Sequence, residues 1–327
     1  MNTSYIYSAA RAQTLATNLL QVADVDRLLA ADTDADVRAA LQESYIGQYV
    51  QTESDFESAL QASELAAKQL VVSIAPDASI FAPLWWRYDF HNIRTFVKAR
   101  MLKFDYEQTL AHFSNLGMYP AETLYTNALS DTLRRLETQL ELAYHQALSY
   151  AEAKEIDKLD HAVDKQYWSL LASRGRTSIN QFMRGFIRLQ IDLHNAITRL
   201  RCQQVDIFDY DRLFVSGGSY EKTTFSSVEA TLAVLLELGG EQVWRSAIEN
   251  YQVTGHFTQI HVAEQMTMVA RAKKASSDMF SEASLVAYIL QVQEGASVLR
   301  TVVEGKRNGL SVEKIRSLLP HSYATHT

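Results

Sequence analysis

The chain has 327 residues, of which 47% are hydrophobic and 21% charged, so it can bury sizeable cores and is not a disordered sequence. Its net charge of −7 and the lack of a basic run argue against a duplex nucleic acid partner and against direct adhesion to anionic lipid headgroups. The single cysteine, Cys202, excludes an internal disulfide and has no base beside it that would indicate a catalytic thiol.

Helix breakers are scarce, with 12 glycines and 4 prolines, and this composition predicts an all-α fold of long helices. Apolar residues at helical spacing predict a helix over 56–70, and the 3-4-4-3 spacing from Leu133 to Ala147 predicts another. The apolar stretches 70–86 and 230–238 are interrupted or too short to span a bilayer, so we expect no direct membrane insertion. The helix breaks are expected at the four prolines: Pro76, Pro83, Pro120 and Pro320.

Two sequence markers recur in the same order along the chain. The first reads DVDRLL at Asp24, DYEQTL at Asp105 and DYDRLF at Asp209. The second lies in YDFHNIRTFVKAR, IDLHNAITRLRCQ and QEGASVLRTVVEGK, where an acid precedes a small polar residue by three positions. These pairs are Asp89 with Asn92, Asp192 with Asn195, and Glu294 with Ser297, at intervals of 103 and 102 residues between the acids.

The repeat predicts three sequential, related helical bundles with boundaries just before DYEQTL and DYDRLF, that is, units 1–104, 105–208 and 209–327. Three long units favour a compact, pseudo-threefold arrangement over an open solenoid. Such an arrangement suits a cap or collar better than an asymmetric catalytic cleft.

Several of these stretches resemble one family in the expected order. They include YSAARAQTLATNLL with DVDRLL, RYDFHNIRTFVKAR, LDHAVDKQYWSLL with IDLHNAITRLR, FVSGGSYEK, and the final AYILQVQEGASVLRTVVEGKRNGLSVEKIRSLL. Together they make the chain similar to the C subunit of archaeal and bacterial A/V-type ATPases, whose eukaryotic counterpart is the d subunit. The last repeat departs from the family pattern, because Ser297 stands where the family usually has Asn.

The resemblance implies a funnel-like, non-catalytic adaptor without a cofactor or metal. It implies that the protein caps the proteolipid ring of the membrane rotor, receives the central-stalk subunits and transmits torque, so that ATP turnover is coupled to H⁺ or Na⁺ transport. We therefore expect a peripheral protein on the cytoplasmic face of the membrane, held there through the rotor ring and monomeric when isolated.

The repeated acid and amide residues have two interpretations. They form a polar stripe that offers contacts to the rotor or stalk, or they form an internal network that fixes helix packing, and we favour the packing network. The arginines near them, Arg94, Arg199 and Arg300, belong to the same motif. The loop at Gly217 and Gly218 lacks a phosphate-binding pattern and, by the resemblance, contacts a neighbouring subunit.

For the other candidate residues we predict structural roles and not functional ones. The aromatics Phe81, Trp85, Trp86, Tyr88 and Phe90 are expected in a core, and His256, His261 and Glu264 do not form a closed set of metal ligands. The stretch at Gly305–Lys306 is typical of a helix C-terminus, with Ser311 as the N-cap of a closing helix and Glu313 in its first turn.

Two alternatives stay open at this point. An unrelated helical scaffold would show a shorter repeat of roughly 34–47 residues and more than three copies. A helical enzyme would need a buried carboxylate or metal site, which metal analysis of the purified protein would detect.

Overall fold

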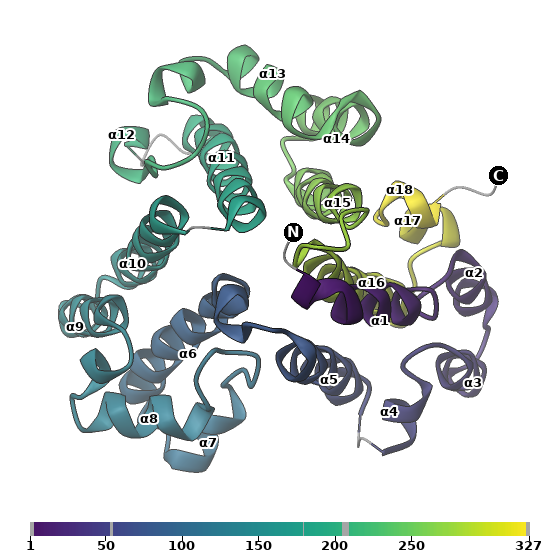
Figure 1. Ribbon diagram of the computed structural model, residues 1–327, viewed down its shortest axis with the longest axis horizontal. Helices are drawn as coiled ribbons and strands as arrows, with labels where there is room; N and C mark the ends of the chain where they lie inside the picture. The colour runs from purple at the N-terminus through teal and green to yellow at the C-terminus, as the bar shows by residue number, and fades with distance from the viewer. Residues whose placement is uncertain (1–2, 53–54, 179, 205–208, 325–327) are drawn as a thin grey trace. The chain divides into compact units, whose positions relative to one another are not determined.

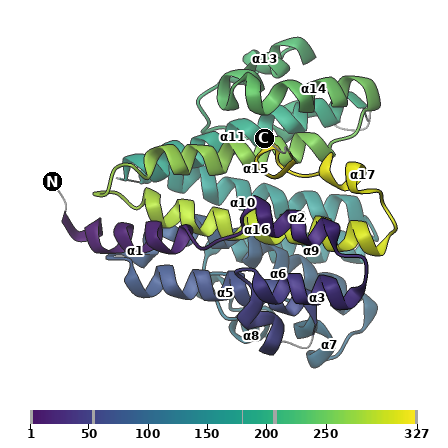
Figure 2. The same ribbon diagram turned by 90° about the vertical axis from the view of Figure 1, so that its right-hand side faces the viewer.

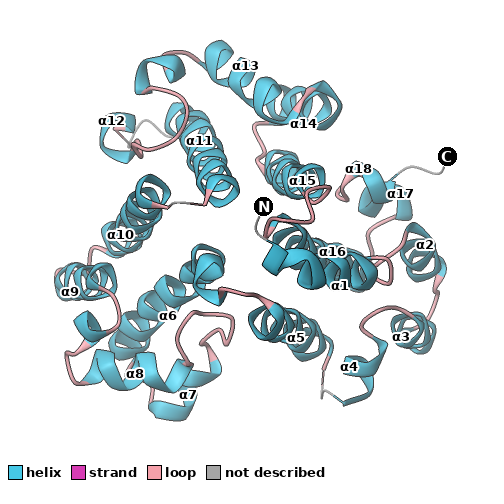
Figure 3. Cartoon of the chain, in the orientation of Figure 1, coloured by secondary structure: helices cyan, strands magenta, loops and turns pink. Residues whose placement is uncertain are grey.

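The computed structural model describes residues 3–52, 55–178, 180–204 and 209–324. Within these ranges the chain forms helices joined by turns and contains no strand (Figure 3), which confirms the all-α prediction. None of the helices in the described ranges is long and apolar enough to cross a membrane. The chain divides into two compact units: unit 1 holds residues 1–78, 199–206 and 223–327, and unit 2 holds 79–198 and 207–222. The division into three repeat units and their pseudo-threefold arrangement remain predictions.

Unit 1 is built from both ends of the chain (Figure 1). Its N-terminal part contains the 3-10 turn η1 (Thr3–Tyr5) and helices α1 (Ile6–Ala16), α2 (Val22–Ala30), α3 (Asp34–Glu43), α4 (Gly47–Thr52) and α5 (Phe56–Ile74). Its C-terminal part contains η4 (Lys222–Phe225), α13 (Val228–Gly239), α14 (Glu241–Thr254), α15 (Thr258–Ala275), α16 (Ala283–Arg307), α17 (Val312–Arg316) and α18 (His321–Ala324).

Helix α16 is the centre of unit 1. It is apolar on most of its faces, and α1, α2, α5 and α15 all pack against it; Figure 2 shows α1 running alongside it. Leu28, Leu60, Leu299 and Val302 are fully buried in the resulting core. Each such aliphatic side chain contributes about 1.5–3 kcal/mol through removal from water. The N-terminal helices of unit 1 therefore depend on a helix that is encoded more than 200 residues later in the chain.

Unit 2 contains η2 (Ala78–Phe81), α6 (Ala82–Leu102), α7 (Tyr106–Ala111), α8 (Ala121–Leu129), η3 (Leu133–Arg135), α9 (Thr138–Glu152), α10 (Ile156–Thr177), most of α11 (Gln181–Gln204), and α12 (Tyr210–Leu213). A short link joins α9 and α10 into an antiparallel hairpin that packs on α6. Phe96 lies in this core and meets the rings of Tyr125 and Tyr144 edge-on, with centroids 5.1 and 5.9 Å away. The buried residues of this core lie within residues 82–191, and the half-buried Val215 packs against them.

The helix ends follow the predicted chemistry in most places. Pro76 and Pro320 lie between helices, Pro83 lies in the first turn of α6 and Pro120 is the N-cap of α8, which confirms the predicted breaks. Ser311 caps α17 by accepting a hydrogen bond from the Lys314 amide at 3.2 Å, as expected. The aromatic cluster is also in a core, because Phe81, Trp85, Trp86 and Phe90 are buried and Tyr88 is half-buried.

Two expectations about helix ends were wrong. The Leu133–Ala147 spacing does not form one helix, because residues 133–135 form the separate turn η3 and α9 begins at Thr138, whose amide donates to the Glu137 carboxylate. Gly305 does not end α16, which continues to Arg307. The left-handed residue is Gly309, with φ +67°, and the Leu310 amide donates to the Gly305 carbonyl at 2.9 Å in a Schellman motif.

Candidate functional site: repeated loop anchors

The first acid and amide pair ties a loop to the middle of α6. Asp89 accepts hydrogen bonds from the backbone amides of Met118 at 2.8 Å and Tyr119 at 3.1 Å. One turn along, Asn92 pairs with both backbone groups of Ser114: its Oδ1 accepts from the amide at 2.7 Å and its Nδ2 donates to the carbonyl at 2.9 Å. We call these two side chains the first loop anchor.

The second pair repeats this geometry on α11. Asp192 accepts from the amides of Ser219 at 2.9 Å and Tyr220 at 3.3 Å, and Asn195 exchanges two hydrogen bonds with the backbone of Val215, both at 2.9 Å. We call Asp192 and Asn195 the second loop anchor. The loop that it holds contains the predicted Gly217–Gly218 stretch.

All four anchor side chains are buried, with 0% exposure. Burial raises the pKa of Asp192, and the hydrogen bonds from Ser219 and Tyr220 oppose that rise. A side-chain amide that pairs with both the N–H and the C=O of one loop residue takes the place that a neighbouring strand would have in a sheet. Both backbone groups of that loop residue are therefore hydrogen-bonded. The carboxylates and amides therefore hold loops inside unit 2 and are not themselves presented at its surface.

Two glycines allow the loops to approach the carboxylates. A Cβ on Gly117 would lie 2.4 Å from Asp89 Oδ1, and one on Gly218 would lie 2.0 Å from Asp192 Oδ1. Any side chain at either position would displace the carboxylate or the loop. Gly218 thus has a packing role, and Gly217 adopts φ +120°, in the region that favours glycine.

The three motif arginines differ in their partners. Arg94 forms ion pairs with Asp160 and Asp164 of α10, and Arg199 donates to the carbonyls of Phe225 and Ser226 ahead of α13. Arg300 binds both oxygens of Glu57 on α5, at 2.9 and 2.7 Å, and holds the pKa of that carboxyl below its usual value. Each arginine joins two segments, but by a different contact.

The third pair, Glu294 and Ser297 on α16, lacks this geometry. In the described part of the chain Glu294 accepts no loop amide, although it is only 4% exposed. Burial raises its pKa, and the nearby Lys273 opposes that rise. Ser297 has a single hydroxyl oxygen and lacks the separate amide oxygen and nitrogen with which Asn92 and Asn195 each pair with one backbone residue.

A part of the repeat that the two sequence markers miss becomes visible in the structure. The N-caps Asp105, Asp209 and Ser311 follow the anchor acids by 16, 17 and 17 residues, and each accepts from a backbone amide two or three residues ahead. By contrast, Asp24 in the DVDRLL stretch lies in the first turn of α2, not at its N-cap. Ser311 is therefore the third N-cap of this series.

The sequences of the two anchored loops, LGMY and GGSY ending at Tyr119 and Tyr220, recur as PHSY ending at Tyr323, where residues 321–324 form α18. His321 occupies the place of Gly117 and Gly218, where the first two anchors have no room for a Cβ. This substitution explains why the third loop is held differently, and Tyr323 instead approaches the Leu20 carbonyl at 3.4 Å.

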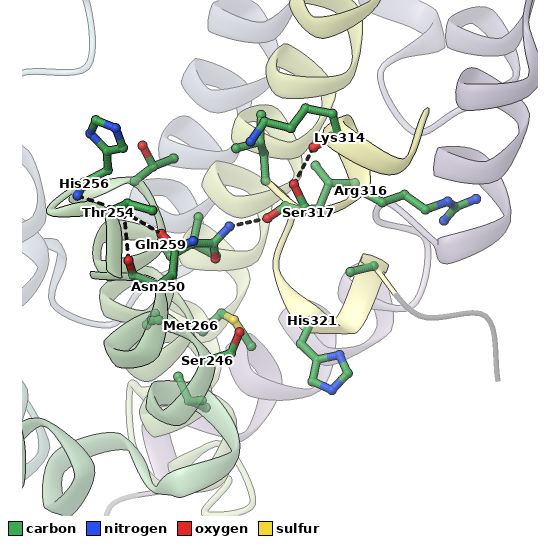
Figure 4. Close-up of a pocket in the computed structure, with 18 of the residues that line it drawn as sticks. Ser246, Asn250, Thr254, His256, Gln259, Met266, Lys314, Arg316, Ser317 and His321 are labelled. Carbon is green, nitrogen blue, oxygen red and sulfur yellow. Dashed lines mark hydrogen bonds between the residues drawn. The ribbon is translucent and has the colours of Figure 1, made fainter. Parts of the chain in front are cut away.

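A surface groove of about 460 Å³ lies in unit 1 between α14, α15 and the segment from α17 to α18 (Figure 4). Its described lining includes Lys314, Arg316 and His321 but no carboxylate or thiol. Gln259 crosses it to donate to the Ser317 carbonyl, and Arg316 is paired with Asp26 at 2.7 Å. The groove therefore offers no acid–base pair for catalysis.

Metal-binding chemistry does not converge in the described residues, where no group of three or more His, Cys, Asp or Glu side chains could hold an ion. His261 lies within hydrogen-bond distance of Glu264 at 3.0 Å and accepts a hydrogen bond from Arg201 at 2.8 Å, so it belongs to a surface hydrogen-bond network and not to a ligand set.

The fold and the two loop anchors define a class of protein. It is an all-helical protein in which a helix, the loop anchored to it and the N-cap of the helix that follows recur along the chain and stabilise the packing. Residues 8–318 match the model of the ATP synthase (C/AC39) subunit family. The chain is 23% identical to the C subunit of the A-type ATP synthase of Methanocaldococcus jannaschii, over 96% of this chain and 86% of that protein. It is 24% identical to the same subunit from Thermococcus onnurineus, over 97% and 90%.

The chain belongs to the ATP synthase (C/AC39) subunit family, as the resemblance predicted. It is accordingly an accessory subunit of a rotary ATPase and not its catalytic one. The motif residues Asp89, Asn92, Asp192 and Asn195 are all buried, so these side chains are not available at the surface for direct contact with a partner.

Proposed function

We propose that this protein is the rotor adaptor of an A/V-type rotary ATPase. It caps the proteolipid ring and seats the central stalk, and it turns with both so that torque couples ATP turnover to ion transport. The family match over residues 8–318 carries this proposal. The protein is expected at the cytoplasmic face of the membrane, held there through the ring, and monomeric when isolated.

Rigidity supports this role, because an element that transmits torque must not bend. Helices of 21 to 25 residues, α6, α10, α11 and α16, form its framework. Loops are commonly the mobile parts of a helical protein, yet here two of them are fixed to the middle of a helix by buried Asp and Asn side chains. The loop anchors therefore restrict motion in two loops, which are the parts of a helical protein that bend most easily.

Purification from membranes tests the assignment. Tagged full-length protein, recovered from detergent-solubilised membranes of its own source, should bring down proteolipid and central-stalk subunits, and an unrelated tagged helical protein should not. Deletion of the gene should abolish ATP-driven ion pumping. Recovery of the protein without either class of subunit, together with normal pumping in the deletion strain, would refute the assignment.

A second experiment tests the mechanical part. The double variant Asn92→Ala/Asn195→Ala should still assemble, yet it should pump fewer ions for each ATP hydrolysed, because its loops are no longer fixed. Ser216→Ala, an exposed change in the second anchored loop, is the matched control. An unchanged coupling ratio in an assembled double variant would exclude a role for the anchors in torque transmission.

A further inference from the structure

One end of unit 2 gathers arginines that are far apart in the sequence. Arg174 lies in the last turn of α10, where it pairs with Glu137 at 3.2 Å and covers the ring of Trp86 at 5.7 Å. Glu137 directly precedes α9 and follows η3, which carries Arg134 and Arg135. Arg176 also lies in the last turn of α10. We call Arg134, Arg135, Arg174, Arg176 and Arg184 the arginine end of unit 2.

Arg184 joins this group because α11 begins shortly after α10 ends. Only residues 178–180 separate the two helices, and Gly175 of α10 packs against Ile187 of α11. No acidic residue occurs between Asp164 and Asp192. The stretch from residue 165 to residue 191 is thus positively charged in a protein whose net charge is −7, whereas Arg134 and Arg135 lie close in sequence to Asp131, Glu137 and Glu141.

Helix stability explains only part of this group. Arg174 and Arg176 complement the negative end of the α10 dipole. Arg184, however, lies in the first turn of α11, where a positive charge opposes the helix dipole and no acidic residue offsets it. In the described part of the chain Arg174 alone of the five has an ion-pair partner, and Arg134, Arg135 and Arg176 are exposed.

We propose that the arginine end binds a carboxylate-rich segment of another protein. All five cations are arginines, whose planar guanidinium pairs with a carboxylate through two hydrogen bonds, as Arg300 does with Glu57 in this protein. A membrane surface fits less well, because Trp86, beside Arg174, and its neighbour Trp85 are buried and cannot anchor in lipid. This inference names the chemistry of a partner and does not depend on the proposed rotor function.

A binding assay with the full-length chain tests it. A fluorescent oligo-glutamate peptide should bind at about 0.1 M salt, where charges more than about 10 Å apart are largely screened, and an oligo-glutamine peptide should not. The variant Arg134→Gln/Arg135→Gln/Arg176→Gln should weaken binding at least about tenfold. Arg174 stays unchanged in this variant so that its contact with Glu137 and Trp86 is kept.

The matched control, Lys158→Gln/Arg212→Gln/Lys222→Gln, removes three exposed cations from elsewhere in unit 2 and should leave the affinity within about twofold. Equal losses in both variants, or no peptide binding, would overturn the proposal. So would binding to phosphatidylserine vesicles that exceeds binding to the peptide, or a salt-dependent self-association that the arginine variant abolishes. Peptide binding, together with failed recovery of ATPase subunits from membranes and normal pumping in the deletion strain, would instead refute only the rotor assignment.

Discussion

Gly117 and Gly218 are the residues on which the anchored loops depend, because each leaves open the space that a carboxylate oxygen occupies. The repeat itself was evident from the Asp-x-x-Asn spacing. The role of the glycines was not evident, because it appears only when the loop is seen in contact with the carboxylate on the helix. The LGMY, GGSY and PHSY sequences could have revealed it, because glycine is lost only where the acid is Glu294 and the amide is replaced by Ser297.

Gly218→Ala should therefore destabilise the protein by about 2–3 kcal/mol, because its Cβ would lie 2.0 Å from Asp192 Oδ1. The free energy of unfolding, measured with urea, checks this. Ser216→Ala in the same loop is exposed and should cost less than about 0.5 kcal/mol. Similar losses in the two variants would show that the loop tolerates displacement from the anchor.

Glu294 gives a prediction about pH. Burial raises its pKa, so the folded state binds this proton more tightly than the unfolded chain does. The resulting stability is fully present below the ordinary value of 4.5 and is lost as the pH rises through the raised pKa of the folded state. Asp24, Lys273 and Tyr323 are the groups that interact electrostatically in this region.

Glu294→Gln should thus become more stable relative to the wild type as the pH rises from about 4.5 to 7, and the difference should be constant below that window. Thermal unfolding at several pH values measures it. The exposed substitution Glu249→Gln should show no such trend. If the stability of Glu294→Gln relative to the wild type instead fell as the pH rose, the folded protein would stabilise the ionised form of the Glu294 carboxyl, contrary to this prediction.

At the scale of helices, the sequence predicted the elements better than their ends. The prolines and Ser311 marked true boundaries because capping and proline chemistry are local. The α9 start was missed because Glu137 caps the helix after a separate 3-10 turn. The α16 end was missed because Gly305 is needed where Ile315 of the next helix packs, since a Cβ added there would lie only 2.7 Å from the Ile315 Cγ1. That contact joins two different helices, so no local sequence pattern around Gly305 predicts it.

The left-handed residue after α16 can be tested directly. Gly309→Ala should lower the stability by about 1 kcal/mol, because φ is +67° there and a Cβ is disfavoured. Gly309→Asn should cost less, since asparagine tolerates this conformation. Chemical denaturation of both variants measures the order, and equal costs would contradict the Schellman assignment.

The anchored loop also makes a prediction for exchange of amide hydrogens. In Asn195→Ala, the Val215 amide loses its acceptor at 2.9 Å, so exchange at Val215 should accelerate together with that at Ser219 and Tyr220. The amides of the α9–α10 hairpin serve as the internal control and should keep their protection. Acceleration across all of unit 2 would mean that the anchor supports the whole core and not one loop.

At the scale of the molecule, the structure divides the chain into two compact units, whereas the sequence repeat divides it into three. Repeat spacing reports ancestry, whereas compact units reflect packing, and here one unit contains both chain ends. The first predicted boundary, at residues 104 and 105, lies between α6 and α7 inside unit 2, and the second lies at residues 208 and 209, beside residues that the structure does not describe. The three-unit division remains a prediction.

Unit 2 should fold without the rest of the chain, because the buried residues of its hydrophobic core lie within 82–191 and Val215, which packs against them, also belongs to this unit. A fragment of residues 79–222 is expected to be helical by circular dichroism and to unfold cooperatively. A fragment of residues 1–78, which lacks α16, should be largely unfolded and serves as the comparison. A fragment 79–222 without a cooperative transition would show that its core needs the other unit.

The position of α16 has a consequence for biosynthesis. The ribosome releases the segment for unit 2 while α1, α2 and α5 still await the helix against which they pack. Until translation reaches residue 307, the faces around Leu28 and Leu60 stay unburied, and nascent chains stalled before that point should recruit chaperones at their N-terminal third.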